Sequence, residues 1–178
     1  PVFGGNVEVS QRLLDTLLLA FGAAACSQGT MNNFVMGDDS RSYYETIGGG
    51  TGAGKGFAGA SGVHVHMSNT AITDPEILEW RFPVRLNRFS LRAGSGGDGQ
   101  WRGGDGLERE IEFLEPQTVS LLGQHRLEQP YGMNGGKEGA CGSQVIIRAD
   151  GTEEALGFAA HTEVKKGDRL VIKTPGGG

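Results

Sequence analysis

The stretch Val7-Glu-Val-Ser-Gln-Arg-Leu-Leu-Asp-Thr-Leu-Leu-Leu-Ala-Phe-Gly-Ala-Ala-Ala25 decides the fold class of this chain. Asn6 is a candidate N-cap for a helix here, and Gly29 lies just past its expected end. Apolar side chains repeat at helical spacing on one face, namely Leu13, Leu14, Leu17, Leu18 and Phe21. From Thr30 onward the pattern changes. The stretch therefore predicts one N-terminal amphipathic helix, followed by structure of another kind.

The rest of the chain consists of short apolar runs between glycine clusters. Glycine makes up 32 of 178 residues without a Gly-X-Y period, which excludes collagen and predicts tight turns and close backbone contacts. A short helical turn is expected after Asp74-Pro75, and hairpin turns at Asp150-Gly151 and Gly167-Asp168. Strands are expected over residues 33–36, 43–47, 63–67, 82–91, 107–114, 119–122, 144–148, 156–158 and 169–173. The predicted fold class is α+β, with the helix preceding a glycine-rich, mainly antiparallel β region.

Composition excludes several classes of protein. The net charge is −5 and the basic residues are interspersed, so no basic tract indicates nucleic-acid binding. No run is long enough to span a membrane, and no signal peptide is visible. Cys26 and Cys141 make neither a disulfide framework nor a metal knuckle, and we expect buried thiols in a reducing compartment. A cytoplasmic location is therefore expected. Both ends of the chain look cut, which suggests a fragment.

A glycine-rich loop, Gly49-Gly-Thr-Gly-Ala-Gly-Lys-Gly56, nearly matches the phosphate-binding pattern G-x-x-x-x-G-K-[ST]. Gly56 stands where that pattern needs the hydroxyl that binds magnesium. Glycines soon return after Phe57, so the long helix that should follow the loop is not predicted. We therefore do not expect a nucleotide site in this loop.

Polar side chains are densest between Ser61 and Glu79. His64 and His66 are two residues apart, so in an extended segment both imidazoles would point to one face. Two histidines do not complete a tetrahedral metal site, which would need further ligands such as Asp74, Glu76, His125 or His161. The alternative is that one histidine is a structural group, hydrogen-bonded to a backbone carbonyl. The residues alone leave both interpretations open.

Two further features have both a structural and a functional interpretation. The loop over residues 91–106 holds seven glycines, which could form an anion-binding nest or a tight connection before a strand. Cys141 and His161 could pair as nucleophile and base, but a packed small residue is the expected role of Cys141.

A series of segments resembles, in one order, the hydantoinase B/5-oxoprolinase family. The series covers essentially the whole chain, and its order makes the resemblance specific. The segments are Gly-Gly-Asn-Val-Glu-Val-Ser-Gln-Arg (4–12), Ser-Gln-Gly-Thr-Met-Asn-Asn (27–33), Tyr-Tyr-Glu-Thr-Ile-Gly-Gly-Gly (43–50), Gly-Val-His-Val-His-Met-Ser-Asn-Thr (62–70), Thr-Asp-Pro-Glu (73–76), Arg-Ala-Gly-Ser-Gly-Gly-Asp-Gly (92–99), Arg-Gly-Gly-Asp-Gly (102–106) and Thr-Pro-Gly-Gly-Gly (174–178).

The resemblance implies that residues 1–178 are the C-terminal portion of a B-type subunit, with a sub-boundary near residue 106 between a motif-rich region (1–106) and a small β region (107–178). It also implies a part in ATP-dependent opening of a cyclic amide such as 5-oxoproline or a hydantoin. In this family ATP binds to the partner A-type, ATPase-like subunit or domain, and a divalent metal is associated with the N-terminal part that is missing here. We expect an oligomer that acts on a small-molecule cyclic amide and is inactive as this fragment.

The candidate catalytic residues are the polar ones within the family segments. They could line or support a region that holds a polar tetrahedral intermediate away from bulk solvent. The candidates are Glu45, His64, His66, Asn69, Asp74 and Arg92. Two alternatives stay open: a fragment of an ATP-dependent acetone- or acetophenone-type carboxylase, and a structural module that docks the partner subunit.

Overall fold

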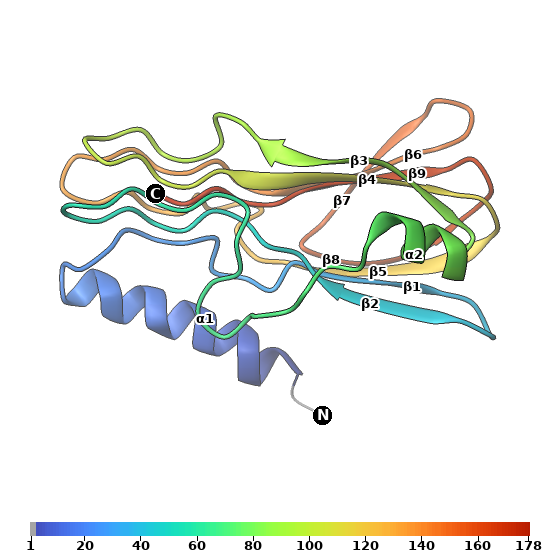
Figure 1. Cartoon of the computed structure of the whole chain (residues 1–178), viewed down its shortest axis with the longest axis horizontal. Helices are drawn as coiled ribbons and strands as arrows, with labels where there is room; N and C mark the ends of the chain where they lie inside the picture. Colours follow the sequence, from blue (N-terminus) through green and yellow to red (C-terminus); the bar gives the residue numbers. More distant parts are fainter. Residues whose placement is uncertain (1–2) are drawn as a thin grey trace.

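The computed structural model describes residues 3–178, which form an elongated molecule with a β-sandwich at one end and a glycine-rich bundle at the other (Figure 1). Over these residues the elements follow in the order α1 (Phe3–Ala20), β1 (Asn33–Gly37), β2 (Ser42–Thr46), α2 (Pro75–Arg81), β3 (Val84–Arg92), β4 (Gly106–Phe113), β5 (Gln117–Leu122), β6 (Ser143–Ile147), β7 (Glu153–Leu156), β8 (Ala159–Val164) and β9 (Arg169–Lys173). The predicted α+β class with mainly antiparallel pairing is confirmed.

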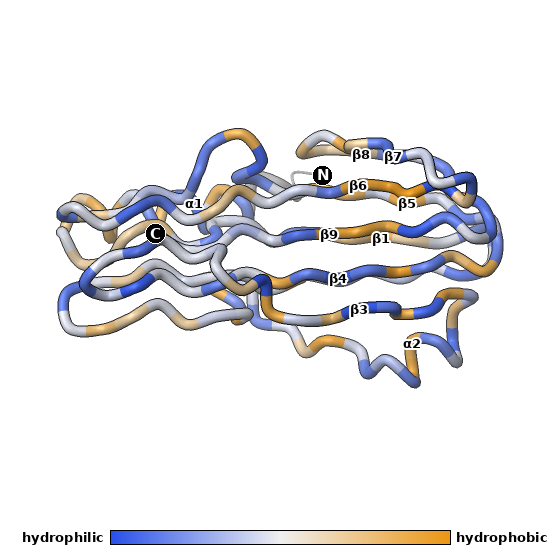
Figure 2. Tube along the Cα trace, turned by 90° about the horizontal axis from the view of Figure 1, so that it is seen from above, coloured by the Kyte–Doolittle hydropathy of each residue, from blue (hydrophilic) through white to orange (hydrophobic). Residues whose placement is uncertain are grey.

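The sandwich consists of two antiparallel sheets. One has the strand order β2-β1-β5-β8 and the other β3-β4-β9-β6-β7. Inward-facing side chains alternate with outward ones along β4, so Ile111 and Phe113 are buried in a core shared with Phe34 and Leu170. Figure 2 shows the apolar positions concentrated along β6 and β9. Each sheet takes strands from both sides of residue 106, and the sub-boundary there stays a prediction.

The glycine-rich bundle, defined as residues 23–30, 47–63, 94–105, 125–142 and 174–178, consists mainly of extended backbone that continues the sandwich strands. Hydrogen bonds between backbones join the segments: Gly50 N–H donates to Pro175 O (3.1 Å) and Gly97 N–H donates to Gly177 O (2.8 Å). Residues 174–178 are all buried and bond to several neighbouring segments. The C-terminal segment is therefore the central element of the bundle.

Close packing of backbone against backbone explains why the bundle is rich in glycine. A Cβ atom added at Gly177 would lie 1.9 Å from Thr51 O, and one at Gly104 would lie 1.9 Å from Ala60 O. Both distances are far below van der Waals contact, and the atoms met belong to the backbone, which cannot rotate away. Only residues without a side chain allow the segments to approach this closely.

Helix α1 lies against the bundle with its polar face inward. Glu8, Gln11 and Asp15 are buried, whereas Leu17 and Phe21 are 43% and 80% exposed. The predicted helix is confirmed, but its apolar stripe faces outward. A bundle made of backbone offers N–H and C=O groups rather than methyl groups, so the complementary helix face must be polar.

The helix ends earlier than expected. Gly22 adopts a left-handed conformation (φ 63°), and the N–H groups of Gly22 and Ala23 bond back to the carbonyls of Leu19 and Leu18. This is a Schellman-type end, in which glycine avoids the steric cost of positive φ. The helix therefore ends at Ala20 rather than at Ala25, where the predicted stretch ends.

Two other expectations change. Residues 63–67 do not form a strand, and His66 has φ 54°, so His64 and His66 do not share the face that an extended segment would give them. Strand β8 was not predicted, because its residues Ala159–Val164 lack a run of apolar side chains. Over residues 3–178, no helix combines the length and the apolar character needed to cross a membrane.

Candidate functional site

Between α1 and the bundle lies a buried polar layer, which we define by Glu8, Gln11, Arg12 and Asp15 of α1 and the side chains that meet them. These four residues are spaced i, i+3, i+4 and i+7, so they share one helix face. Glu8 Oε1 accepts from Met31 N–H (2.8 Å) and Gln11 Nε2 donates to Ser68 Oγ (3.2 Å). The layer therefore ties the helix both to the bundle and to the segment that carries the histidines.

His66 joins the polar layer through Asp15. Its Nε2 lies 2.9 Å from Asp15 Oδ1, and the same oxygen accepts from Ser27 N–H at 3.1 Å. The His66 side chain keeps 10% of its surface exposed, and that of Asp15 only 3%. A carboxylate held by a backbone donor and bound to an imidazole orients the ring, which is the arrangement of an acid–base pair.

A second imidazole, His125, enters the layer from the bundle. Its Nδ1 donates to Glu128 O (2.8 Å), so Nε2 carries the lone pair that accepts from the Arg12 guanidinium. The Cys26 Sγ lies 3.7 Å from the same Nε2. His125 is therefore held as the neutral Nδ1–H tautomer beside a thiol.

Burial sets the protonation of this pair. It lowers the pKa of His125 and raises the pKa of the Cys26 thiol, a rise to which the nearby Asp15 carboxylate adds. Both shifts favour the neutral thiol and the neutral imidazole, whereas a nucleophilic cysteine needs a lowered pKa. Cys26 and His125 are close together, but they do not form an activated thiolate.

Two carboxylate oxygens of the polar layer have no hydrogen-bond donor. Asp15 Oδ2 and Glu8 Oε2 are buried and unpartnered, and burial raises the pKa of Glu8. A Cβ added at Gly29 would lie 2.8 Å from Asp15 Oδ2 and 3.1 Å from His125 Nε2. Glycine at this position leaves room between the carboxylate and the imidazole, where a larger residue would separate them.

The structure distributes the six predicted site residues over several places. His66 alone reaches the polar layer through a side-chain contact with α1. His64 Nε2 pairs with Thr70 Oγ1 (3.2 Å), which also approaches Thr46 O at 3.5 Å. Asn69 is exposed in the loop between them.

The other three make contacts that hold the fold. Glu45 forms an ion pair with Arg109 (3.0 Å) that is almost wholly buried between the sheets. Asp74 caps α2 by accepting from Glu76 N–H at 2.9 Å. Arg92 donates to Cys141 O (2.6 Å) and to Thr174 O, so it joins β3 to the central segment of the bundle.

Sequence reasoning missed Asp15, Arg12, Cys26 and His125 as a group. The available signal was the polar stripe of α1, whose four polar residues recur at helical spacing beside the leucines. The partners of that stripe come from distant segments, and no local pattern marks them. His161 does not pair with Cys141. Its Nδ1 lies instead 2.8 Å from the Oγ atom of Ser120 on β5.

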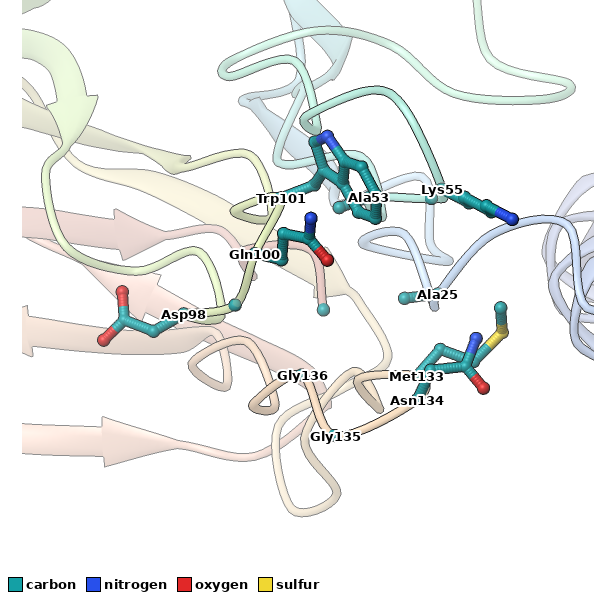
Figure 3. A pocket seen from close by; sticks show the side chains of 13 residues that line it. Ala25, Ala53, Lys55, Asp98, Gln100, Trp101, Met133, Asn134, Gly135 and Gly136 are labelled. Carbon is teal, nitrogen blue, oxygen red and sulfur yellow. The ribbon is translucent and has the colours of Figure 1, made fainter.

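The loop that resembles a phosphate-binding loop borders a cavity of about 340 Å³ at the end of the bundle (Figure 3). Ala53, Gly54 and Lys55 line one side, and the indole of Trp101 and the amide of Gln100 stand over the centre. No helix follows the loop in the structure, as the glycines at its end predict. Ala25, the residue before Cys26, also lines the cavity.

Metal ligands do not cluster in the part of the chain that the structure describes. Within residues 3–178, no group of three or more His, Cys, Asp or Glu side chains is arranged to hold a metal ion. His64 and His66 bond to Thr70 and Asp15 instead of converging.

Comparison with known proteins identifies the family to which the chain belongs. The model of the Hydantoinase B/oxoprolinase family matches residues 1–178. The chain therefore belongs to the hydantoinase B/oxoprolinase family, as the sequence segments predict.

Similar proteins are much longer than this chain. The 5-oxoprolinase 1 of Arabidopsis thaliana is 54% identical over 177 residues, which cover 99% of this chain and 14% of the relative. Among solved structures, the ATP-dependent caprolactamase from Pseudomonas jessenii is 27% identical with a TM-score of 0.72, covering 87% of this chain and 29% of that one. Acetone carboxylase shares the fold at 18% identity with a TM-score of 0.67, covering 90% of this chain and 26% of that one.

Proposed function

We propose that the chain is part of an ATP-dependent cyclic-amide hydrolase that opens 5-oxoproline or a closely related lactam. The observation that carries this proposal is the 54% identity to a 5-oxoprolinase across nearly the whole chain. The likeness to an ATP-dependent caprolactamase supports it, since caprolactam is also a cyclic amide. The chain spans about 14% of the 5-oxoprolinase, so the complete activity belongs to a longer protein.

The proposed division of labour follows from the chemistry of amides. A lactam carbonyl resists water, and ATP activates it by phosphorylating the carbonyl oxygen. We place the ATP site in an A-type, ATPase-like subunit or domain, since the loop that ends in Lys55 lacks both the hydroxyl and the helix of a phosphate-binding loop. This chain then supplies one wall of the site where the C–N bond breaks.

Within that wall, His66 is the proposed acid–base residue and Asp15 its positioning residue. The departing ring nitrogen needs a proton as the C–N bond breaks, and an imidazole can supply it near neutral pH. His66 fits this role because it is oriented by a buried carboxylate and still touches solvent. The other candidate residues are proposed to line or support the site, namely Glu45, His64, Asn69, Asp74 and Arg92.

The test uses the full-length enzyme with its ATPase partner. We expect His66→Gln to lower kcat for 5-oxoproline hydrolysis by about 10²–10⁴-fold, because it removes the proton donor. Asp15→Asn should lower kcat less while the enzyme stays folded. His161→Gln is the matched control, since His161 is exposed on β8, where its Nδ1 lies 2.8 Å from Ser120 Oγ.

Undiminished turnover by a folded His66→Gln enzyme would overturn the role of this residue. If His66→Gln instead abolished assembly with the partner subunit, the alternative of a docking module would be favoured. Product formation that requires bicarbonate would favour the carboxylase alternative.

A further inference from the structure

The outward face of α1 is an apolar surface without a partner among the described residues. Leu13, Leu14 and Leu17 lie on it at helical spacing, with 57%, 38% and 43% of their surfaces exposed, and Phe21, directly after the helix, extends the stripe with 80% exposed. A single exposed leucine is ordinary, whereas a contiguous apolar stripe on one helix marks an interaction surface.

The rotation of the helix is fixed by its other face. Glu8, Gln11 and Asp15 hold backbone and side-chain partners in the bundle and in the loop that carries His66. Turning the leucines inward would remove these hydrogen bonds from buried carboxylates. The leucines therefore face outward because the polar layer requires it.

The chemistry of the stripe indicates its partner. Between Leu13 and Phe21 the sole charged residue is Asp15, which points inward. A helix that binds a membrane surface carries lysines and arginines beside its apolar face, but the one basic residue of this region, Arg12, contacts His125 in the polar layer. An uncharged apolar stripe matches an apolar protein surface.

We propose that the outward face of α1 packs against an apolar surface of the same polypeptide, from outside residues 1–178. The lengths of similar proteins carry the choice of occupant: the chain covers 14% of the Arabidopsis relative and 29% of the caprolactamase chain, so most of such a polypeptide lies elsewhere. Helix α1 is then the middle layer of a composite core, polar towards the bundle and apolar towards the rest of the protein.

A photo-crosslinking experiment on the full-length protein identifies the occupant. The residue to replace is Phe21, by p-benzoylphenylalanine, because it is the most exposed aromatic side chain of the stripe. Irradiation should give an intramolecular cross-link to a peptide from outside residues 1–178. The same probe at Trp80, which is 79% exposed on α2, is the control and should not label that peptide.

Charge substitutions give an independent readout in the same protein. Leu17→Lys should lower the midpoint of thermal unfolding, because it places an ammonium group in an apolar contact. Thr16→Lys, on the exposed flank of the same helix, should leave the midpoint close to that of the wild type. A cross-link between two copies, a cross-link confined to residues 1–178, or equal midpoints for the two variants would overturn the proposal.

Discussion

At the scale of single residues, this chain uses polar side chains to bind backbone. Asp15 accepts from Ser27 N–H, and Asp105 does the same for Gly96 N–H at 2.8 Å. Such contacts recur because a glycine-rich bundle has few side chains with which to make a core. Sequence reasoning could select His66 by its neighbours, but it could not find Asp15 as its partner. The two residues are 51 positions apart, and nothing local connects them.

Asp105 allows a prediction about stability and pH. Besides Gly96 N–H it accepts from the Arg102 guanidinium (2.8 Å), and the hydrogen bond from Arg102 is the main cause that lowers the pKa of Asp105 to about 2. We expect Asp105→Asn to lower the free energy of unfolding by about 1–3 kcal/mol at pH 7, because it weakens bonds to a buried acceptor. Urea denaturation of the chain measures the difference.

The sign of the pH dependence follows from the direction of the shift. A carboxyl group whose pKa is lowered by folding stabilises the fold above its unfolded value of 3.8, and the contribution disappears as the pH falls through about 2. The gap between wild type and Asp105→Asn should therefore narrow between pH 4 and pH 2. Asp39→Asn, at an exposed position, is the control; a gap that stays constant with pH would contradict the assignment.

At the scale of elements, most strands of the sandwich were predictable, but the pairing of segments in the bundle was not. Strand β4 alternates buried and partly buried positions, and the turn at Asp150-Gly151 has the expected glycine with φ 88°. The segments of the bundle show no such alternation. Glycines, which lack side chains, allow these segments to pack, and no repeat of apolar residues marks them. The sequence therefore indicated close backbone contacts without showing which segments meet.

Gly177 tests the packing of the bundle. Its φ lies outside the left-handed region, so the effect of Gly177→Ala is steric: the new Cβ would lie 1.9 Å from Thr51 O. We expect a loss of at least about 1–3 kcal/mol of stability, the usual cost of overpacking, because the atom met is backbone. Circular dichroism during thermal unfolding provides the measurement.

Gly157→Ala is the matched control for this experiment. The nearest atom to a Cβ there is Ala159 O at 3.9 Å, an ordinary contact, and no positive φ is involved. It should unfold near the wild-type temperature. Similar midpoints for both variants would show that the bundle is more loosely packed than the structure indicates.

At the scale of the whole molecule, we propose that residues 1–178 hold one wall of a site and one side of an interface. The polar layer, the exposed stripe of α1 and the lengths of the relatives agree on this point. Sequence reasoning recognised the family because its segments occur in order. It could not predict the inverted helix, since periodicity identifies an apolar face without saying what covers it.

The whole-molecule prediction concerns activity. We expect the 178-residue chain alone to show neither 5-oxoproline hydrolysis nor 5-oxoproline-dependent ATP hydrolysis, because the proposed ATP site lies in the partner subunit or domain. Full-length protein with that partner should show both activities. Glutamate release measured beside phosphate release checks the expectation, and turnover by the isolated chain would contradict it.

The glycine-rich bundle has a consequence for how this protein can change over generations. Glycine codons all begin with two guanines, and a change at either one introduces a side chain or a stop. Where a Cβ meets a neighbouring backbone, as at Gly104 and Gly177, nearly every such change places atoms in space that is already filled. The sandwich core can exchange one apolar side chain for another. Glycines packed against backbone cannot be replaced in this way. The codons for these glycines should therefore tolerate synonymous third-position changes and few others.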